Sequence, residues 1–228
     1  MSFSRELART RAMTWKELRI EGRTMANFSS VLFLAVLMLL LFGFALGSNT
    51  EALQDAAAGV VWLAIVFSGV LAFNRSYQVE LDDDALETLL LYPGARWPIF
   101  VGKLLANLLF VFAVEIIVVP LAAVLFHAPL ASNFGVLIGV LVLGTFGFVT
   151  LGTFYAAVAS RTRAREVLLP LLLLPMLVPV LIAAAKLTQI AASGDVMGDT
   201  ASWFRMLAAF DLIFFTASIA VFDSVIGG

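Results

Sequence analysis

Polar side chains interrupt two long apolar stretches of the chain. Glu115 lies near the middle of residues 99–126, and Asn107 lies two helical turns before it. A charged carboxylate at the centre of a bilayer costs about 2.5–3.5 kcal/mol, so Glu115 should face other helices and be protonated or paired with a polar group. It would serve either a translocation path or proton relay, or a hydrogen bond that packs two helices together. Asp211 raises the same alternatives at lower cost, because it lies nearer the end of the last apolar stretch.

A charged island, from Asn74 to Pro98, directly precedes the apolar stretch that holds Glu115, and it contains five acids within residues 80–87. Leucines follow at helical spacing, so residues 79–93 are predicted to form a short helix with one apolar face. Such a helix would insert its leucines into a groove on a partner while its acids meet basic residues at the rim. The alternative is a solvated loop whose leucines lie on the bilayer. The residues assigned to this partner contact are Glu80, Leu86, Glu87, Leu89, Leu90 and Pro93.

The elements that would position these residues are membrane-spanning helices. Of the 228 residues, 62% are hydrophobic and only 13% are charged, about half the charged fraction of a soluble domain. Each apolar stretch has about 18 residues or more, enough to cross a hydrocarbon core of roughly 30 Å as a helix. We therefore predict an all-α membrane protein in which residues 1–228 form one domain. The six predicted spans are residues 28–47, 56–73, 99–126, 134–159, 167–185 and 203–225.

Basic residues predict the orientation of these spans. Twelve of the fourteen Lys and Arg residues fall in the N-terminal segment and in the loops after the second and fourth spans. The other side has only Lys186 and Arg205. Because cytoplasmic loops carry the excess of Lys and Arg, both termini and the acidic island should be cytoplasmic.

The N-terminal residues 3–25 alternate apolar and charged side chains at roughly helical spacing. Phe3, Leu7, Trp15 and Leu18 are among the apolar members, and basic residues lie between them. We predict an interfacial helix along the cytoplasmic membrane surface. A loose basic tail is the alternative.

Small residues recur along the fourth span. Small side chains let helix backbones approach closely in a membrane. This span would pack inside the bundle or form the interface of a homodimer. The glycines concerned are Gly135, Gly139, Gly144, Gly147 and Gly152.

The fifth span contains Pro170, Pro175 and Pro179. Each proline removes a backbone donor and clashes with the preceding turn, so we expect a kinked or irregular helix. The kink would be either a moving part or a static bend.

The cysteine and histidine counts, the net charge and the lack of catalytic motifs exclude several classes of function. No Cys is present, His127 is the single histidine, and the net charge of −2 gives no nucleic-acid footprint. A lone histidine is either a haem ligand or simply solvated. No hydrolase, metalloprotease or Walker A motif occurs, so we expect no enzymatic activity and no cofactor or metal bound by this chain. If ATP drives the protein, another chain must bind it.

Two stretches resemble the CcmB family, the haem exporter protein B family of ABC-2 type permeases. The first is Leu86 to Pro93 with the following Gly102-Lys103. The second begins at Gly144-Thr-Phe-Gly147 and continues through Ser160-Arg-Thr-Arg-Ala-Arg-Glu-Val-Leu-Leu-Pro170 to Pro179. Ala85 and Gly94-Ala95 depart from the family pattern, which has a Gly and a Pro-rich turn at these places in many members.

The resemblance implies a permease subunit in the bacterial cytoplasmic (inner) membrane. Its expected partners are a separate CcmA-like ATPase, a second copy of itself, and CcmC-, CcmD- and CcmE-like proteins. The ATP cycle would export haem as a substrate or release the haem-loaded periplasmic chaperone. One His and no Cys favour a mechanical role over haem binding. The alternatives are an ABC-2 exporter of another amphipathic substrate and a non-transporting membrane scaffold.

Overall fold

The computed structural model describes residues 3–82, 96–160, 162, 165–195 and 198–227, and these residues contain helices and no strand. Six of the helices are long and apolar enough to cross a membrane, which confirms the predicted all-α, six-span architecture. A further helix, α1, precedes them. The helices are α1 (Phe3–Thr24), α2 (Ala26–Leu46), α3 (Thr50–Asp82), α5 (Trp97–Leu125), α6 (Phe134–Ser160), α7 (Arg165–Ser193) and α8 (Thr200–Gly227).

The helices extend beyond the predicted spans, most of all α3 and α7. The second span was expected at 56–73, but α3 begins at Thr50 and continues to Asp82. The fifth was expected at 167–185, but α7 continues to Ser193, and Gly194 follows it with a φ of +91°. Apolarity marks only the part of a helix inside the hydrocarbon, whereas the helix itself continues into polar sequence. Thr188 lies in this extension and is buried.

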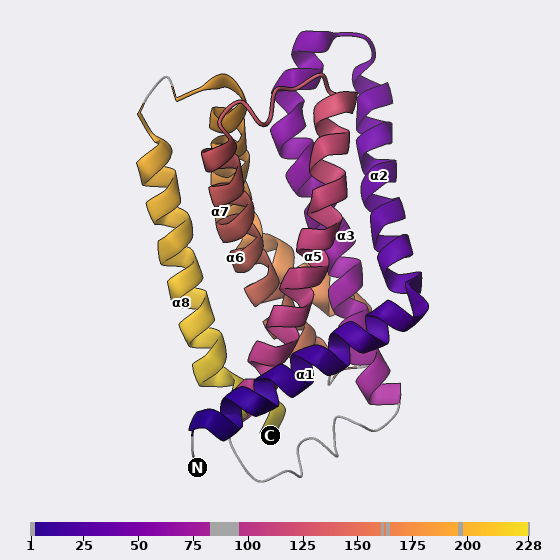
Figure 1. Ribbon diagram of the computed structural model, residues 1–228, viewed down its shortest axis with the longest axis vertical. Coiled ribbons are helices and arrows are strands. Elements are labelled where there is room, and N and C mark those ends of the chain that lie inside the picture. The colour runs from indigo at the N-terminus through magenta and orange to yellow at the C-terminus, as the bar shows by residue number, and fades with distance from the viewer. Residues whose placement is uncertain (1–2, 83–95, 161, 163–164, 196–197, 228) are drawn as a thin grey trace.

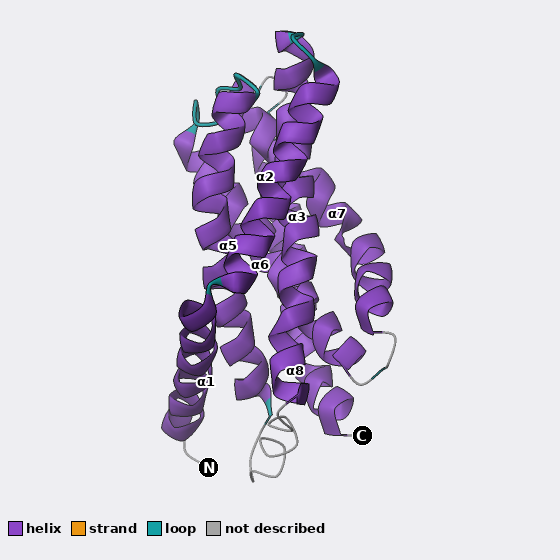
Figure 2. Ribbon diagram, turned by 90° about the vertical axis from the view of Figure 1, so that its right-hand side faces the viewer, coloured by secondary structure: helices purple, strands orange, loops and turns teal. Residues whose placement is uncertain are grey.

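Both ends of the chain lie at one end of the bundle. Figures 1 and 2 show both termini at the same end of the bundle, with the last turns of α3 and the first turns of α5. Helix α1 crosses the base of α5 obliquely, and Met25 alone joins it to α2. Met25 has a φ of +47°, an uncommon conformation for a residue with a side chain, which makes this corner abrupt.

The predicted partner-contact segment, residues 79–93, is described only in part. Residues 79–82 continue α3 without a break, so the short separate helix predicted to begin at 79 does not start there, and Glu80 belongs to α3. The other members of the segment, Leu86, Glu87, Leu89, Leu90 and Pro93, lie outside the described residues.

Helix α6 contacts α3, α5, α7 and α8. Two of its glycines face α3. A Cβ on Gly144 would lie 2.5 Å from Cη2 of Trp62, and the ring of Phe73 fills the same place at Gly152. Both rings are fully buried. The absent side chains therefore let two large aromatic residues of α3 lie directly on the α6 backbone.

A second pair of glycines faces α8. The ring of Phe204 lies against Gly139, and the carboxylate of Asp211 lies against Gly147. Gly135 differs, since only Asn133 comes near it, with Oδ1 3.7 Å from the position of a Cβ. Four of the five glycines singled out in the sequence thus lie at helix contacts within one chain, and Gly135 does not.

Helix α7 is continuous through its three prolines. Its buried stripe is formed by Leu169, Leu173, Leu177 and Val180, at successive turns. Pro170 and Pro179 are half-buried and Pro175 is exposed. The prolines therefore lie beside the packed stripe, and the irregularity expected there does not interrupt the helix.

We predict that Gly144→Ala destabilises the bundle by about 1–3 kcal/mol, because overpacking a filled core costs that much. The Trp62 ring cannot withdraw freely, since its Nε1 donates a hydrogen bond of 2.9 Å to Thr188 Oγ1. The measurement is the apparent melting temperature of the purified protein in detergent. Gly135→Ala is the matched control and should leave that temperature unchanged. Equal melting temperatures for the two variants would contradict the assigned packing.

Candidate functional site

A buried lysine joins three helices at the base of the bundle. Lys103 lies near the start of α5 and its side chain is 0% exposed. Its Nζ donates to Glu17 Oε1 of α1 at 3.0 Å and to the backbone oxygen of Ser76 of α3 at 2.9 Å. A buried ammonium group needs such partners, because removing it from water without them is costly. Lys103 therefore fixes α1 and α3 against α5.

The backbone of α5 beside Lys103 is in direct contact with α1. A Cβ on Gly102 would lie 2.6 Å from Met13 Cβ, and Thr14 Oγ1 donates to Gly102 O at 3.1 Å. A side chain at residue 102 would push α1 away. Gly102 and Lys103 thus form one docking point, at which glycine permits the close approach and lysine supplies the ionic contact.

The face of α1 that packs on α5 is not the apolar face predicted from the sequence. Glu6, Thr10 and Met13 are buried, whereas Leu7 and Trp15 are 52% and 66% exposed. The apolar stripe therefore remains available to lipid, as expected for an interfacial helix. The polar stripe went unrecognised because hydrophobic periodicity gives no signal for it. In the sequence, Gly102 and Lys103 are marked as a pair by the resemblance to the CcmB family alone.

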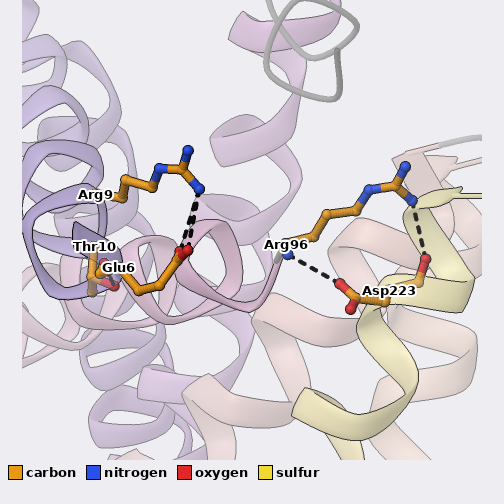
Figure 3. A network of polar contacts seen from close by, with 5 residues as sticks. All are labelled: Glu6, Arg9, Thr10, Arg96 and Asp223. Atoms are coloured by element: carbon orange, nitrogen blue, oxygen red, sulfur yellow. Dashed lines mark hydrogen bonds and ion pairs between the residues drawn. The ribbon is translucent and has the colours of Figure 1, made fainter. Parts of the chain in front are cut away.

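A second contact ties the start of α5 to the end of α8. Figure 3 shows the backbone N of Arg96 donating to Asp223 Oδ1 at 3.2 Å and Arg96 Nη1 donating to Asp223 O at 3.3 Å. Just inside these groups, the buried rings of Phe100 and Phe222 lie 5.1 Å apart. The exposed polar contact contributes little energy by itself, but the ring contact is buried. The helices on both sides of residues 83–95 are therefore held: α3 by Lys103, and α5 by α1 and α8.

Two hydrogen bonds join α5 to α6 within the membrane-spanning region. Asn107 Nδ2 donates to Thr153 Oγ1 at 3.0 Å, and Thr145 Oγ1 donates to Glu115 Oε1. Each helix places its two residues eight positions apart, about 12 Å along the axis, as antiparallel helices in register require. Glu115 forms no ion pair with any described residue, and its Oε2 has no hydrogen-bond partner among them. The contact observed for Glu115 is a hydrogen bond that packs two helices together, the second of the two roles considered from the sequence.

Asp211 is separate from this pair. It is 5% exposed, lies against Gly147 and has no hydrogen-bond partner for either carboxylate oxygen within the described ranges. Thr145 and Gly147 are two residues apart on α6 and point about 200° apart around it. The Glu115 and Asp211 carboxylates therefore flank α6 on different sides.

No cluster of potential metal ligands is found among the described residues. His127 is exposed in the turn after α5, where its backbone oxygen accepts a hydrogen bond from Gln54. Within the part of the chain that the structure describes, no three His, Cys, Asp or Glu residues are grouped as metal ligands. The distinctive feature is thus the joint at Lys103 together with the α5–α6 hydrogen bonds.

The comparison with protein families covers the residues of these contacts. The family model described as "CcmB protein" matches residues 9–225, which include the Lys103 joint and all six spans. The chain belongs to the CcmB family.

Curated CcmB relatives cover most of the chain. A protein of Rhodobacter capsulatus named "Heme exporter protein B" is 31% identical over 184 residues, 81% of this chain and 84% of that protein. Proteins of the same name are 28% identical in Pseudomonas aeruginosa, over 90% of this chain and 92% of the relative, and 30% identical in Haemophilus influenzae, over 77% and 79%. The similarity to the CcmB family therefore extends over the whole multi-pass membrane bundle.

We predict that Lys103→Met strongly lowers the melting temperature of this CcmB protein, because removing one partner of a buried ion pair costs about 3–5 kcal/mol. Adding Glu17→Gln should recover part of the loss, since the stranded carboxylate is then removed. Lys186→Met, at an exposed lysine of α7, is the control and should have no effect. The joint is misassigned if Lys103→Met and Lys186→Met melt alike, or if the double variant loses the sum of the two single effects.

A separate prediction concerns Thr145 and Thr150, which are both fully buried on α6. Thr145→Val removes the donor to Glu115 and leaves a buried carboxyl unsatisfied, so it should cost about 1–3 kcal/mol. Thr150 Oγ1 has no partner among the described residues, so Thr150→Val should be neutral or stabilising. Melting temperatures of the two variants check this. An equal loss in both would show that the hydrogen bond to Glu115 contributes nothing specific.

Proposed function

We propose that this chain is the permease subunit of an ABC transporter for cytochrome c maturation in the bacterial cytoplasmic membrane. Family membership and the printed name of the relatives, heme exporter protein B, support this role. The sequence has no Walker A motif, so the ATP would be bound and hydrolysed by a separate CcmA-like subunit. The permease itself would catalyse no reaction.

The observation that carries the proposal is the joint at Lys103. Residues 79–93 are the proposed contact with the ATPase, and they begin in α3, whose Ser76 is bonded to Lys103. A displacement imposed on this segment would act on α3 and α5 together, because Lys103 connects them. Since the same ammonium group is bonded to Glu17, α1 would move with them.

The interior offers a route from this joint across the bundle. Helix α3 lies on α6 through Trp62 and Phe73, and α6 lies on α8 through Gly139 and Gly147. Close-packed surfaces of this kind transmit a displacement, because protein interiors have low compressibility. We propose that α3 and α6 carry motion from the ATPase to the opposite end of the membrane domain.

The proposed result of that motion is haem handling on the periplasmic side, either haem export or release of a haem-loaded chaperone. We favour the mechanical release. The chain has one histidine and no cysteine as strong ligands for haem iron, and His127 lies in a turn after α5. CcmC-, CcmD- and CcmE-like proteins and a second copy of this chain are the proposed partners.

The docking part of the proposal predicts that Leu86→Asp abolishes copurification of the co-expressed ATPase, because a charge on the apolar face would be buried in the partner groove. Thr88→Asp places the same charge in the same segment about 200° away from Leu86 on a helix, and should preserve copurification. Pull-down of the ATPase with tagged permease measures both. Normal ATPase recovery with Leu86→Asp would refute the docking site, and loss of the ATPase with both variants would refute the assigned face.

The alternatives for Glu115 are separated by Glu115→Gln. The amide oxygen can still accept from Thr145, so the packing role predicts normal cytochrome c maturation in cells carrying this variant. A proton relay would require the acid, and maturation would then fail although the protein remains folded.

A further inference from the structure

A groove of about 900 Å³ lies between α1 and α5, beside the Lys103 joint. Pockets for small ligands have volumes of about 300–1,000 Å³, so the groove is large enough for an extended apolar ligand. Its lining is largely apolar and includes the exposed side chains of Leu7, Trp15 and Leu105. One charged side chain, Arg11, also lines it.

The lining follows from the helical spacing of α1. Leu7, Arg11, Trp15 and Leu18 recur at intervals of three or four residues and form one stripe of the helix. The neighbouring stripe, Glu6, Thr10, Met13 and Glu17, is packed on α5. The α1–α5 contact thus holds the apolar stripe beside Leu105 without covering it.

The described acidic side chains of α1 pair with cations other than Arg11, so its guanidinium group is available to bind an anion. Glu6 pairs with Arg9 at 3.4 Å, and Glu17 pairs with Lys103. These are the two acids of α1 whose side chains the structure describes, and both are engaged by other cations. Arg11 is exposed and forms no hydrogen bond or ion pair with any described residue. The groove therefore combines an apolar floor with an uncompensated guanidinium group.

We propose that this groove binds an anionic phospholipid of the cytoplasmic leaflet. Its acyl chain lies against Leu7, Leu18 and Leu105, and Arg11 holds its phosphate, for which a guanidinium group is well suited. Trp15 lies at the polar–apolar boundary, the level that tryptophan prefers in membranes. The bound lipid covers the open side of α1 and so holds this helix on the Gly102–Lys103 docking point. This binding site does not depend on the proposed function.

Quenching of Trp15 fluorescence tests the proposal. The full-length protein is reconstituted in phosphatidylcholine vesicles that contain brominated phosphatidylglycerol or brominated phosphatidylcholine, each titrated over the same range of mole fractions. The difference between the wild type and Trp15→Phe isolates the Trp15 signal from the other tryptophans. We expect half-maximal quenching at about five-fold lower mole fraction of the anionic lipid, the preference that one basic residue near the surface provides.

Two arginine variants make the test specific. Arg11→Gln should abolish the preference for phosphatidylglycerol while quenching by brominated phosphatidylcholine persists. Arg19→Gln makes the same charge change at an exposed arginine of α1 that does not line the groove, and should keep the preference. Three results would overturn the site: equal quenching by the two lipids in the wild type, equal loss of preference in both arginine variants, or no quenching of Trp15 by either lipid.

Discussion

The burial of one ammonium group is the constraint on which the base of this membrane domain depends. Lys103 is fully buried, so it must keep both Glu17 and the carbonyl of Ser76 as partners. Those partners belong to two helices distant in sequence from each other. Neither α1 nor α3 can leave α5 without exposing a charge to an environment that does not solvate it. Three elements that could otherwise slide independently are thereby held as one unit.

The middle of the bundle is held by complementary shape and by side-chain hydrogen bonds between helices. Glycines of α6 admit Trp62 and Phe73 on one side and α8 on another, and the pairs Asn107–Thr153 and Glu115–Thr145 fix the register of α5 against α6. Such contacts suit an interior without water, where apolar burial alone does not favour one helix pairing over another. The base of the bundle is therefore stabilised by an ionic contact, and its middle is stabilised by close packing and hydrogen bonds.

The sequence allowed the architecture to be predicted better than its contacts. Six spans follow from hydrophobic length, and the α6 glycines stand out because small residues there have a physical use. Glu115 and Asn107 stand out as polar residues in apolar sequence, but their partners Thr145 and Thr153 do not, since threonine is unremarkable in a membrane helix. The pairing of Glu17 with Lys103 joins residues 86 positions apart, and no local pattern encodes such a distance.

The ends of the helices were predicted less well for a related reason. Hydropathy marks the hydrocarbon boundary, so it gave no signal for the added turns of α3 and α7. The amphipathic pattern of α1 indicated its lipid-facing stripe but not the polar stripe that contacts α5, since Thr10 and Glu17 resemble ordinary surface residues. Polar contacts between helices distant in sequence can therefore be identified only from the three-dimensional structure.

The separation of Glu17 and Lys103 along the chain also orders the events of biosynthesis. Glu17 leaves the ribosome 86 residues before its partner, so α1 has no cation to dock against while α2 and α3 enter the membrane. Lys103 arrives with α5, and only then can the N-terminal helix settle in its final place. Helix α1 is thus synthesised before α2 and α3 but is secured only after both of them.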